Sequence, residues 1–141
     1  MRLWHKNLLS VLPRLQLVSQ YRECCCIAKS IAEKGTPNHI LVNRIMDYPL
    51  NHFASYTAFV IAEMRARGYK VNSDKFWKWM SKTDWCSPDF IKISGGLFEG
   101  WHNDRYLRQC LLNLQEKYDC DGIPADEWQV ICERFEGYVE E

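Results

Sequence analysis

The chain has 141 residues, 47% of them hydrophobic and 13% aromatic, so it is long enough to bury a core and has the composition of a globular protein. Its formal net charge is zero, which by itself gives no sign of a protein that binds nucleic acid. No apolar run approaches the roughly 20 residues of a membrane span, and Lys6, Pro13 and Arg14 interrupt any signal-peptide core, so we predict a cytoplasmic protein with no membrane partner.

The first predicted element is a long helix over residues 13–33. Pro13 is tolerated in its first turn, and Gly35 and Pro37 end it. Its apolar residues recur at the i, i+4, i+7 spacing of an amphipathic helix. They are Leu17, Tyr21, Cys24, Ala28 and Ile31, flanked by Val18, Cys25 and Ala32.

Later segments also predict helices, because no stretch shows the sustained period-two alternation of a strand. The expected ranges are 39–46, 51–67, a helix capped by Asn72 or Ser73 and ending at Met80, 103–118, and a C-terminal helix opened by Pro124 with Trp128, Ile131, Phe135 and Tyr138 on one face. Residues 82–101 contain Pro88 and three glycines and should be mostly irregular. We therefore predict an all-α fold, a single compact multi-helix domain over residues 1–141.

The zero net charge hides an asymmetry between the two halves of the chain. Residues 1–71 contain ten Lys and Arg against four Asp and Glu, whereas residues 72–141 contain eight against fourteen. Such a distribution can turn one face toward a polyanion, or both sets can be ordinary solvated surface. We interpret the acidic C-terminal residues as a solvated helix that does not touch DNA: Asp121, Asp126, Glu127, Glu133, Glu136, Glu140 and Glu141.

Cysteine and histidine spacing gives no metal site. The seven cysteines include three in a row, Cys24 to Cys26, and form no CxxC pair, so buried or unreactive thiols are expected. His39, His52 and His102 show no ligand spacing either. A metal-dependent nuclease is disfavoured, since no clustered Asp, Glu and His motif appears.

The outward face of the first helix carries a carboxylate among basic residues. At 100° per residue, Gln16, Glu23 and Lys34 lie to one side of the apolar stripe, and Arg22 and Lys29 lie to the other. Nearby cations favour the ionised form of Glu23. This face is either a functional site or a solvated surface with ordinary ion pairs.

Three segments together carry a family resemblance. They are Met1-Arg2-Leu3-Trp4-His5, then Tyr21-Arg22-Glu23, and the stretch Val60-Ile61-Ala62-Glu63-Met64-Arg65-Ala66-Arg67-Gly68-Tyr69. They resemble the pyrimidine-dimer DNA glycosylases, which are small helical repair enzymes. The first half of the chain carries the resemblance, and the second half shares only a helical outline.

The resemblance implies a mechanism that needs no metal or organic cofactor. An N-terminal α-amine attacks C1′ of a damaged nucleotide and forms a Schiff base, a glutamate stabilises the cation, and β-elimination nicks the strand. Arg2 is too bulky to permit methionine removal, so the expected nucleophile is the amine of Met1, with Glu23 as the catalytic carboxylate. An α-amine has an ordinary pKa near 8, so part of it is neutral at cellular pH.

The resemblance also implies contacts with damaged double-stranded DNA, made by a protein we expect to be a monomer. The candidate DNA-binding residues are Arg2, His5, Gln16, Arg22 and Lys29. Gln16 and Cys26 stand where the family has a histidine and an arginine. These departures favour abasic-site chemistry over recognition of a pyrimidine dimer.

Two alternatives stay open. Phe76, Trp77, Trp79 and Trp85, interleaved with Lys75, Lys78 and Lys82, form either part of the core or a platform for unstacked bases. The whole chain is either a DNA glycosylase with abasic-site lyase activity or a non-catalytic DNA-binding or protein-interaction module on the same fold.

Overall fold

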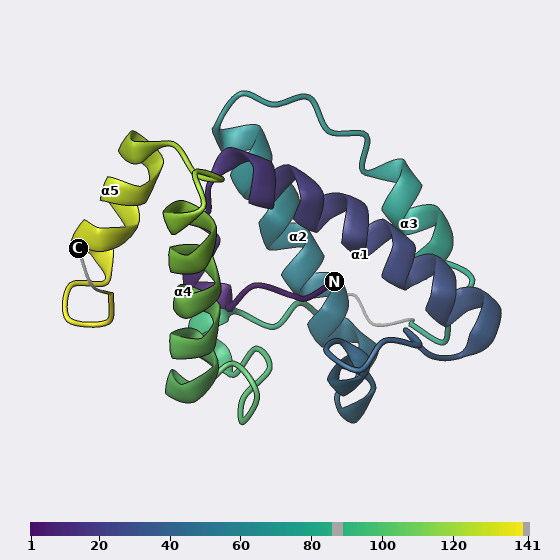
Figure 1. Cartoon of the computed structure of the whole chain (residues 1–141). Coiled ribbons are helices and arrows are strands. Elements are labelled where there is room, and N and C mark those ends of the chain that lie inside the picture. The colour runs from purple at the N-terminus through teal and green to yellow at the C-terminus, as the bar shows by residue number, and fades with distance from the viewer. Residues whose placement is uncertain (86–88, 140–141) are drawn as a thin grey trace.

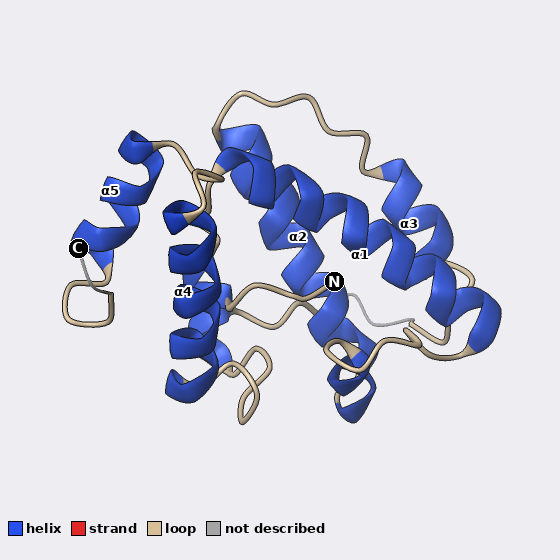
Figure 2. Cartoon of the chain, in the orientation of Figure 1, coloured by secondary structure: helices blue, strands red, loops and turns tan. Residues whose placement is uncertain are grey.

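A computed structural model describes residues 1–85 and 89–139, and these residues confirm the all-α prediction (Figures 1 and 2). They form five α-helices and three short 3-10 helices, with no strand beyond one isolated bridge between Glu136 and Val139. The α-helices are α1 (Arg14–Lys34), α2 (Leu50–Ala66), α3 (Asp74–Met80), α4 (Asp104–Asp119) and α5 (Ala125–Arg134), and the 3-10 helices are η1 (Lys6–Leu8), η2 (Asn43–Asp47) and η3 (Ile93–Gly95).

Helix α1 follows its sequence signals to within one residue at each end. Pro13 precedes it, and Gly35 ends it in the left-handed conformation, with φ of 75° and its N–H donated to the Ile31 carbonyl. The predicted apolar stripe is buried. Gln20 is fully buried on the same face, which the apolar pattern did not predict.

Helix α2 is the central helix, since residues on most of its circumference are buried. Arg67, just past its end, donates to the carbonyls of Leu12 and Leu9 and pairs with Glu63 at 3.0 Å. These bonds satisfy carbonyls in the loop that leads into α1. The basic end of the 60–69 stretch therefore fixes how the N-terminal segment enters the first helix.

Two helix predictions needed correction. Residues 39–46 form turns and the short η2 in place of a helix, because Asn43 Oδ1 accepts the His39 N–H and competes with helical bonding. Helix α5 ends at Arg134, and Phe135 leaves helical geometry, so Tyr138 does not share its face. The Tyr138 hydroxyl instead donates to Asp104 of α4 at 2.7 Å.

The predicted irregular segment is confirmed over the part of 82–101 that the structure describes, where η3 is the only helical turn; Pro88 and Cys86 lie outside it. Cys24, Cys25, Cys110 and Cys132 are buried, whereas Cys26 and Cys120 are exposed. No helix in the described ranges is both long and apolar enough to cross a membrane.

The arrangement leaves the N-terminal segment at the centre. Helix α1 packs against α2 and α3, while α4 stands on the opposite side of the N-terminal segment, with α5 beyond it (Figure 1). The N-terminal segment therefore lies between the group formed by α1, α2 and α3 and the group formed by α4 and α5 (Figure 1).

Candidate active site

The first residues of the chain are extended and held by one buried side chain, Gln20 of α1. Its Oε1 accepts the Trp4 N–H at 2.7 Å, and its Nε2 donates to the Arg2 carbonyl at 2.9 Å. The Tyr56 hydroxyl of α2 donates to the Trp4 carbonyl at 2.6 Å. Buried backbone groups need such partners, so these bonds fix the register of the segment against α1 and α2.

Glu23 lies one turn after Gln20 and shares its amide. Gln20 Nε2 is 3.4 Å from Glu23 Oε2 while it bonds the Arg2 carbonyl. Glu23 is half-buried, and Met1 is 43% exposed. The carboxylate and the Arg2 carbonyl thus share a single amide group, next to a Met1 residue that is partly open to solvent.

The other side of the N-terminal segment is held by residues 97–106. The Tyr106 hydroxyl donates to the Leu3 carbonyl, and the Lys6 N–H donates to His102 Nδ1 at 3.0 Å. Lys6 Nζ donates to the Leu97 carbonyl at 2.6 Å. The segment is therefore fixed on both flanks.

His5 and His102 form a buried, stacked pair with ring centroids 5.2 Å apart. Burial lowers the pKa of His5 to about 4 and the pKa of His102 well below its ordinary value. Both rings are therefore neutral at pH 7. His5 is only 2% exposed, and its Nδ1 accepts the Asn7 N–H, which leaves no ring surface for a phosphate in this conformation.

The remaining DNA-contact candidates differ in their surroundings. The Arg2 guanidinium lies over the Trp4 ring at 5.3 Å, and Arg22 is exposed next to Glu23. Lys29 is exposed further along α1, 5.6 Å from the Trp79 ring. Gln16 is half-buried, and its Oε1 has no hydrogen-bond partner among the described residues. The structure thus brings the Arg2 carbonyl and the Glu23 carboxylate to the same Gln20 amide, whereas Lys29 lies about two turns further along α1.

The aromatic residues of α3, with Trp85 after it, pack in or against the hydrophobic core, which favours the first of the two interpretations. Phe76 is fully buried. The Trp77 ring packs edge-on against the Phe76 ring, with centroids 4.9 Å apart, and its centroid lies 5.3 Å from that of Trp85. These rings belong to the core. Trp79 is half-buried and lies 4.7 Å from Lys82 Nζ, with Lys29 also on its ring.

Sequence reasoning missed three residues that hold the site: Gln20, Tyr56 and Tyr106. Gln20 carried a usable signal, because it is a polar residue close to the apolar stripe, one turn before Glu23. Tyr56 lies in the predicted helix 51–67, and its sequence position gives no sign that its hydroxyl bonds the Trp4 carbonyl. The partner of Tyr106 is 103 positions away in the chain, and no local pattern indicates it.

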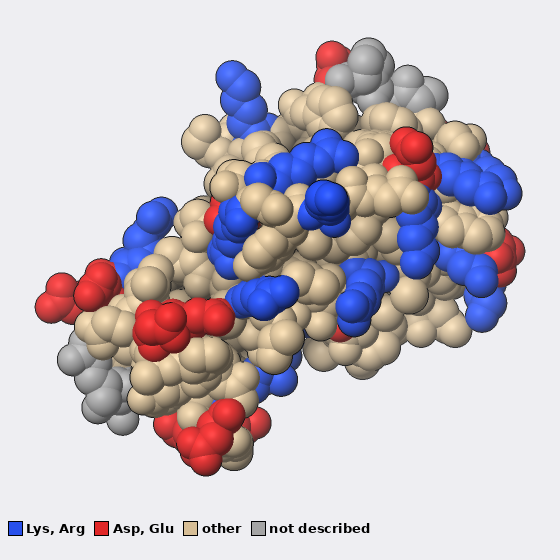
Figure 3. All heavy atoms as spheres, turned by 90° about the horizontal axis from the view of Figure 1, so that it is seen from above, with Lys and Arg blue, Asp and Glu red and all other residues tan. Residues whose placement is uncertain are grey.

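The surface charge follows the asymmetry of the sequence. On the face in Figure 3, acidic side chains gather mainly at the end where α5 lies, and Lys and Arg spread across the remainder. Not every acidic residue of α5 is free surface: Glu127 Oε2 accepts the Arg14 N–H at 2.7 Å and so caps α1. Within residues 1–85 and 89–139, no group of three His, Cys, Asp or Glu side chains could hold a metal ion.

Comparison with known proteins gives one match. Residues 1–76, just over half of the chain, match the family model for pyrimidine dimer DNA glycosylase. No curated protein and no solved structure matches the chain. The matched stretch includes Met1, Gln20 and Glu23 and stops before His102 and Tyr106.

Proposed function

The chain belongs to the pyrimidine dimer DNA glycosylase family, and on that premise we propose that it is a DNA-repair glycosylase with abasic-site lyase activity whose nucleophile is the Met1 α-amine. Family membership indicates a glycosylase that acts on damaged DNA. The observation that carries the finer proposal is the Gln20 amide, which bonds the Arg2 carbonyl and lies 3.4 Å from Glu23. It ties the residue after the amine to the carboxylate that the chemistry needs.

The proposed reaction begins with the neutral α-amine. At a damaged nucleotide, the amine nitrogen bonds to C1′, loses a proton, and the base leaves with the electron pair of the glycosidic bond. The sugar ring then opens: the C1′–O4′ bond breaks, O4′ takes up a proton, and the nitrogen lone pair forms the C1′=N bond. At an existing abasic site, the amine adds to the C1′ aldehyde, and water leaves. Both routes give the same protonated Schiff base at C1′. Loss of a C2′ proton then expels the 3′ phosphate by β-elimination, and hydrolysis of the Schiff base frees the amine.

Glu23 has two tasks in this scheme. Its carboxylate accepts the proton that the amine loses on attack, and it stabilises the cationic Schiff base electrostatically. The half-buried position of the carboxylate strengthens its interaction with the cation, because water screens less there. Gln20 positions both groups without taking part in proton transfer.

The DNA contacts are assigned by position. Arg2 follows the amine in the chain and the exposed Arg22 precedes Glu23, and we propose that they bind the phosphates on either side of the damaged nucleotide. The Gln16 Oε1 on the same helix is buried without a partner, so we propose that Gln16 reaches DNA after its side chain rotates outward, whereas Lys29 already extends the exposed basic surface along α1. For His5 we propose an indirect part: it stacks on His102 and bonds Asn7, and so holds the segment that carries the amine.

The proposed substrate is damaged double-stranded DNA, with an abasic site preferred to a pyrimidine dimer. Gln16 and the exposed Cys26 stand where the family has a histidine and an arginine, so two polar contacts to the lesion are missing. The attack at C1′ itself needs neither. We also propose that residues 1–141 form one domain that acts as a monomer.

Borohydride trapping tests this function. Borohydride reduces a Schiff base to a stable amine, so wild-type protein should form a covalent complex with a duplex that contains one abasic site. Glu23→Gln, or chemical blocking of the N-terminus, should greatly reduce both trapping and strand nicking. Trapping and nicking at the wild-type level by both altered proteins would contradict the mechanism.

The second candidate is a non-catalytic DNA-binding module, which the departures at Gln16 and Cys26 favour. It predicts binding to duplex DNA that weakens steeply with salt, with no trapping and no nicking by the wild-type protein. The same assay therefore separates the two functions.

A further inference from the structure

The turn before η2 displays two large apolar side chains to solvent beside the proposed active site. Ile40 is 83% exposed and Leu41 is 48% exposed. They are neighbours at the tip of one turn, so they form a small continuous apolar surface, and Ile40 is the most exposed of the large hydrophobic side chains in the described residues. The residues on both sides of this pair, His39, Val42 and Asn43, are held by hydrogen bonds within the turn.

Hydrogen bonds within the turn fix its backbone, although the side chains at its tip are exposed. His39 donates its N–H to Asn43 Oδ1 at 2.9 Å, and the N–H groups of Val42 and Asn43 bond the His39 carbonyl. Val42, next to the exposed pair, is fully buried. The fold therefore presents Ile40 and Leu41 in a fixed position, so little ordering entropy would be lost when they insert into a partner.

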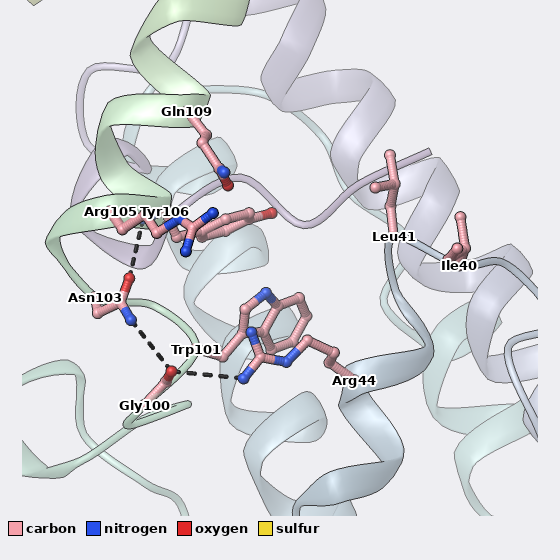
Figure 4. A pocket seen from close by; sticks show the side chains of 9 residues that line it. All are labelled: Ile40, Leu41, Arg44, Gly100, Trp101, Asn103, Arg105, Tyr106 and Gln109. Atoms are coloured by element: carbon pink, nitrogen blue, oxygen red, sulfur yellow. Dashed lines mark hydrogen bonds between the residues drawn. The ribbon is translucent and has the colours of Figure 1, made fainter.

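A groove separates this tip from α4 (Figure 4). Its larger part has a volume of about 470 Å³, with Arg44 on the side of the turn and Arg105 and Gln109 on the side of α4. A second hollow of about 340 Å³ is lined by Arg2 and Asn113, and Leu41, Tyr106 and Gln109 border both. The groove thus runs from the turn to the residue that follows the proposed nucleophile.

The charges along the groove are of one sign. Arg2, Arg44 and Arg105 line it, and no Asp or Glu does. The Arg44 guanidinium lies over the Trp101 ring at 5.7 Å and is 3.5 Å from the Gly100 carbonyl, so it is held at the groove wall. Three guanidiniums along one groove, with no carboxylate beside them, fit the phosphates of a nucleic-acid strand.

We propose that Ile40 and Leu41 form an apolar wedge that enters between neighbouring base pairs of the substrate duplex, while the adjoining groove takes the backbone of one strand. Proteins that bend DNA insert such side chains between base steps and hold the displaced backbone with basic residues. The occupant is DNA and not an apolar protein face, because the apolar tip covers two residues only and the surface beside it is cationic. Unstacking at the wedge opens the duplex next to the Met1 amine. This inference rests on the proposed function.

The test compares Ile40→Ala/Leu41→Ala with Leu15→Ala, a control whose side chain is 67% exposed on α1 and lines neither hollow. The probe is a duplex with one abasic site and 2-aminopurine, whose fluorescence rises on unstacking, at the neighbouring position. At saturating protein, the double variant should lose about fivefold or more of the fluorescence rise that wild type and Leu15→Ala give. A wild-type rise from the double variant overturns the wedge.

Trapping on single-stranded abasic DNA separates the wedge from the proposed lyase, because a single strand needs no unstacking. The double variant should trap single-stranded substrate at the wild-type rate and duplex substrate several-fold more slowly. If the wild-type protein unstacks the duplex through the wedge but traps neither substrate, the result supports the wedge and contradicts the proposed lyase activity. If wild type does not bind the duplex at all, both proposals fall.

Salt dependence tests the groove by itself. Arg105→Ala should lower the slope of log affinity against log salt by about one phosphate contact. Arg108→Ala is the matched control, since Arg108 is on α4 but pairs with Asp104 and lines neither hollow. Equal slopes for the two variants would overturn the assignment of the groove to the DNA backbone.

Discussion

The two parts of the chain divided by residue 76 differ in what they supply. Residues 1–76 match the glycosylase family and hold the amine, Glu23 and the side chains that join them. Residues 77–141 lie outside the match and carry the acidic excess, yet Tyr106 and His102 bond the N-terminal segment, and Glu127 caps α1. Residues that hold the candidate site therefore lie both inside and outside the stretch that matches the family.

The two parts are therefore expected to respond differently to substitution. The proposed chemical groups lie in the matched part, where their spacing along α1 is recognisable. The unmatched part contributes hydrogen bonds and packing that many sequences can provide. Removal of the proposed chemical groups in the first part should therefore affect the reaction, whereas loss of the bonds that His102, Tyr106 and Glu127 make should affect the stability of the fold.

The largest expected effect is on catalysis, from Glu23→Gln. It keeps the shape of the side chain and removes its charge, so the rate of strand nicking should fall about 100-fold or more. Single-turnover kinetics on an abasic duplex measures this. Glu33→Gln, an exposed carboxylate on the same helix, should leave the rate unchanged. Equal rates for the two variants would remove Glu23 from the mechanism.

The next effect is on stability in the matched part, from Gln20→Leu. The change leaves the buried Trp4 N–H without its acceptor, so the free energy of unfolding should fall by about 3 kcal/mol in urea titrations. Gln16→Leu is the matched control, because the Gln16 Oε1 has no partner among the described residues and its loss should cost little. If both variants unfold at the same urea concentration, Gln20 does not hold the segment.

The pH dependence tests the contact between the two parts. The pKa of His5 is lowered to about 4 in the folded protein and is near 6.5 unfolded, so the unfolded chain binds more protons between these values. The free energy of unfolding should therefore fall as pH drops from 6.5 to 4, by on the order of 2 kcal/mol for His5, with His102 adding to the loss. The variant His5→Asn/His102→Asn should show a flatter profile over the same range.

The smallest expected effect comes from the acidic end of the unmatched part. Glu127→Ala removes the carboxylate that caps α1, where Pro13 offers no side-chain acceptor, and should cost about 1 kcal/mol of unfolding free energy at neutral pH. Asp126→Ala, an exposed change in the first turn of the same helix, controls for the charge. Equal losses would mean that α5 is the solvated helix that the sequence suggested.

The sequence predicted the helices well because each long helix carries its own apolar stripe and its own stop signals, as α1 does between Pro13 and Gly35. It failed where competing local bonds decide the geometry, as at Asn43, and where a ring packs beyond a helix end, as at Phe135. The limit is physical, because hydrophobic periodicity reports which face is buried and does not report which polar atoms meet.

For the candidate site, spacing along one helix placed Glu23 near the basic residues, and the resemblance indicated the amine. The backbone of residues 2–4, which follows the amine, is held by Gln20, Tyr56 and Tyr106 from three helices. Their hydrogen bonds span 16 to 103 positions, and only the fold brings them together. His5 was expected to contact phosphate because it lies near the amine in sequence, but its burial follows from packing against His102.

Mass spectrometry of the trapped complex identifies the nucleophile directly. Wild-type protein is trapped on an abasic duplex with borohydride, digested with a protease and mapped by mass spectrometry. The proposed mechanism predicts a deoxyribose adduct on the α-nitrogen of Met1. An adduct on a lysine side chain, such as Lys6 or Lys29, with an unmodified Met1 would contradict it.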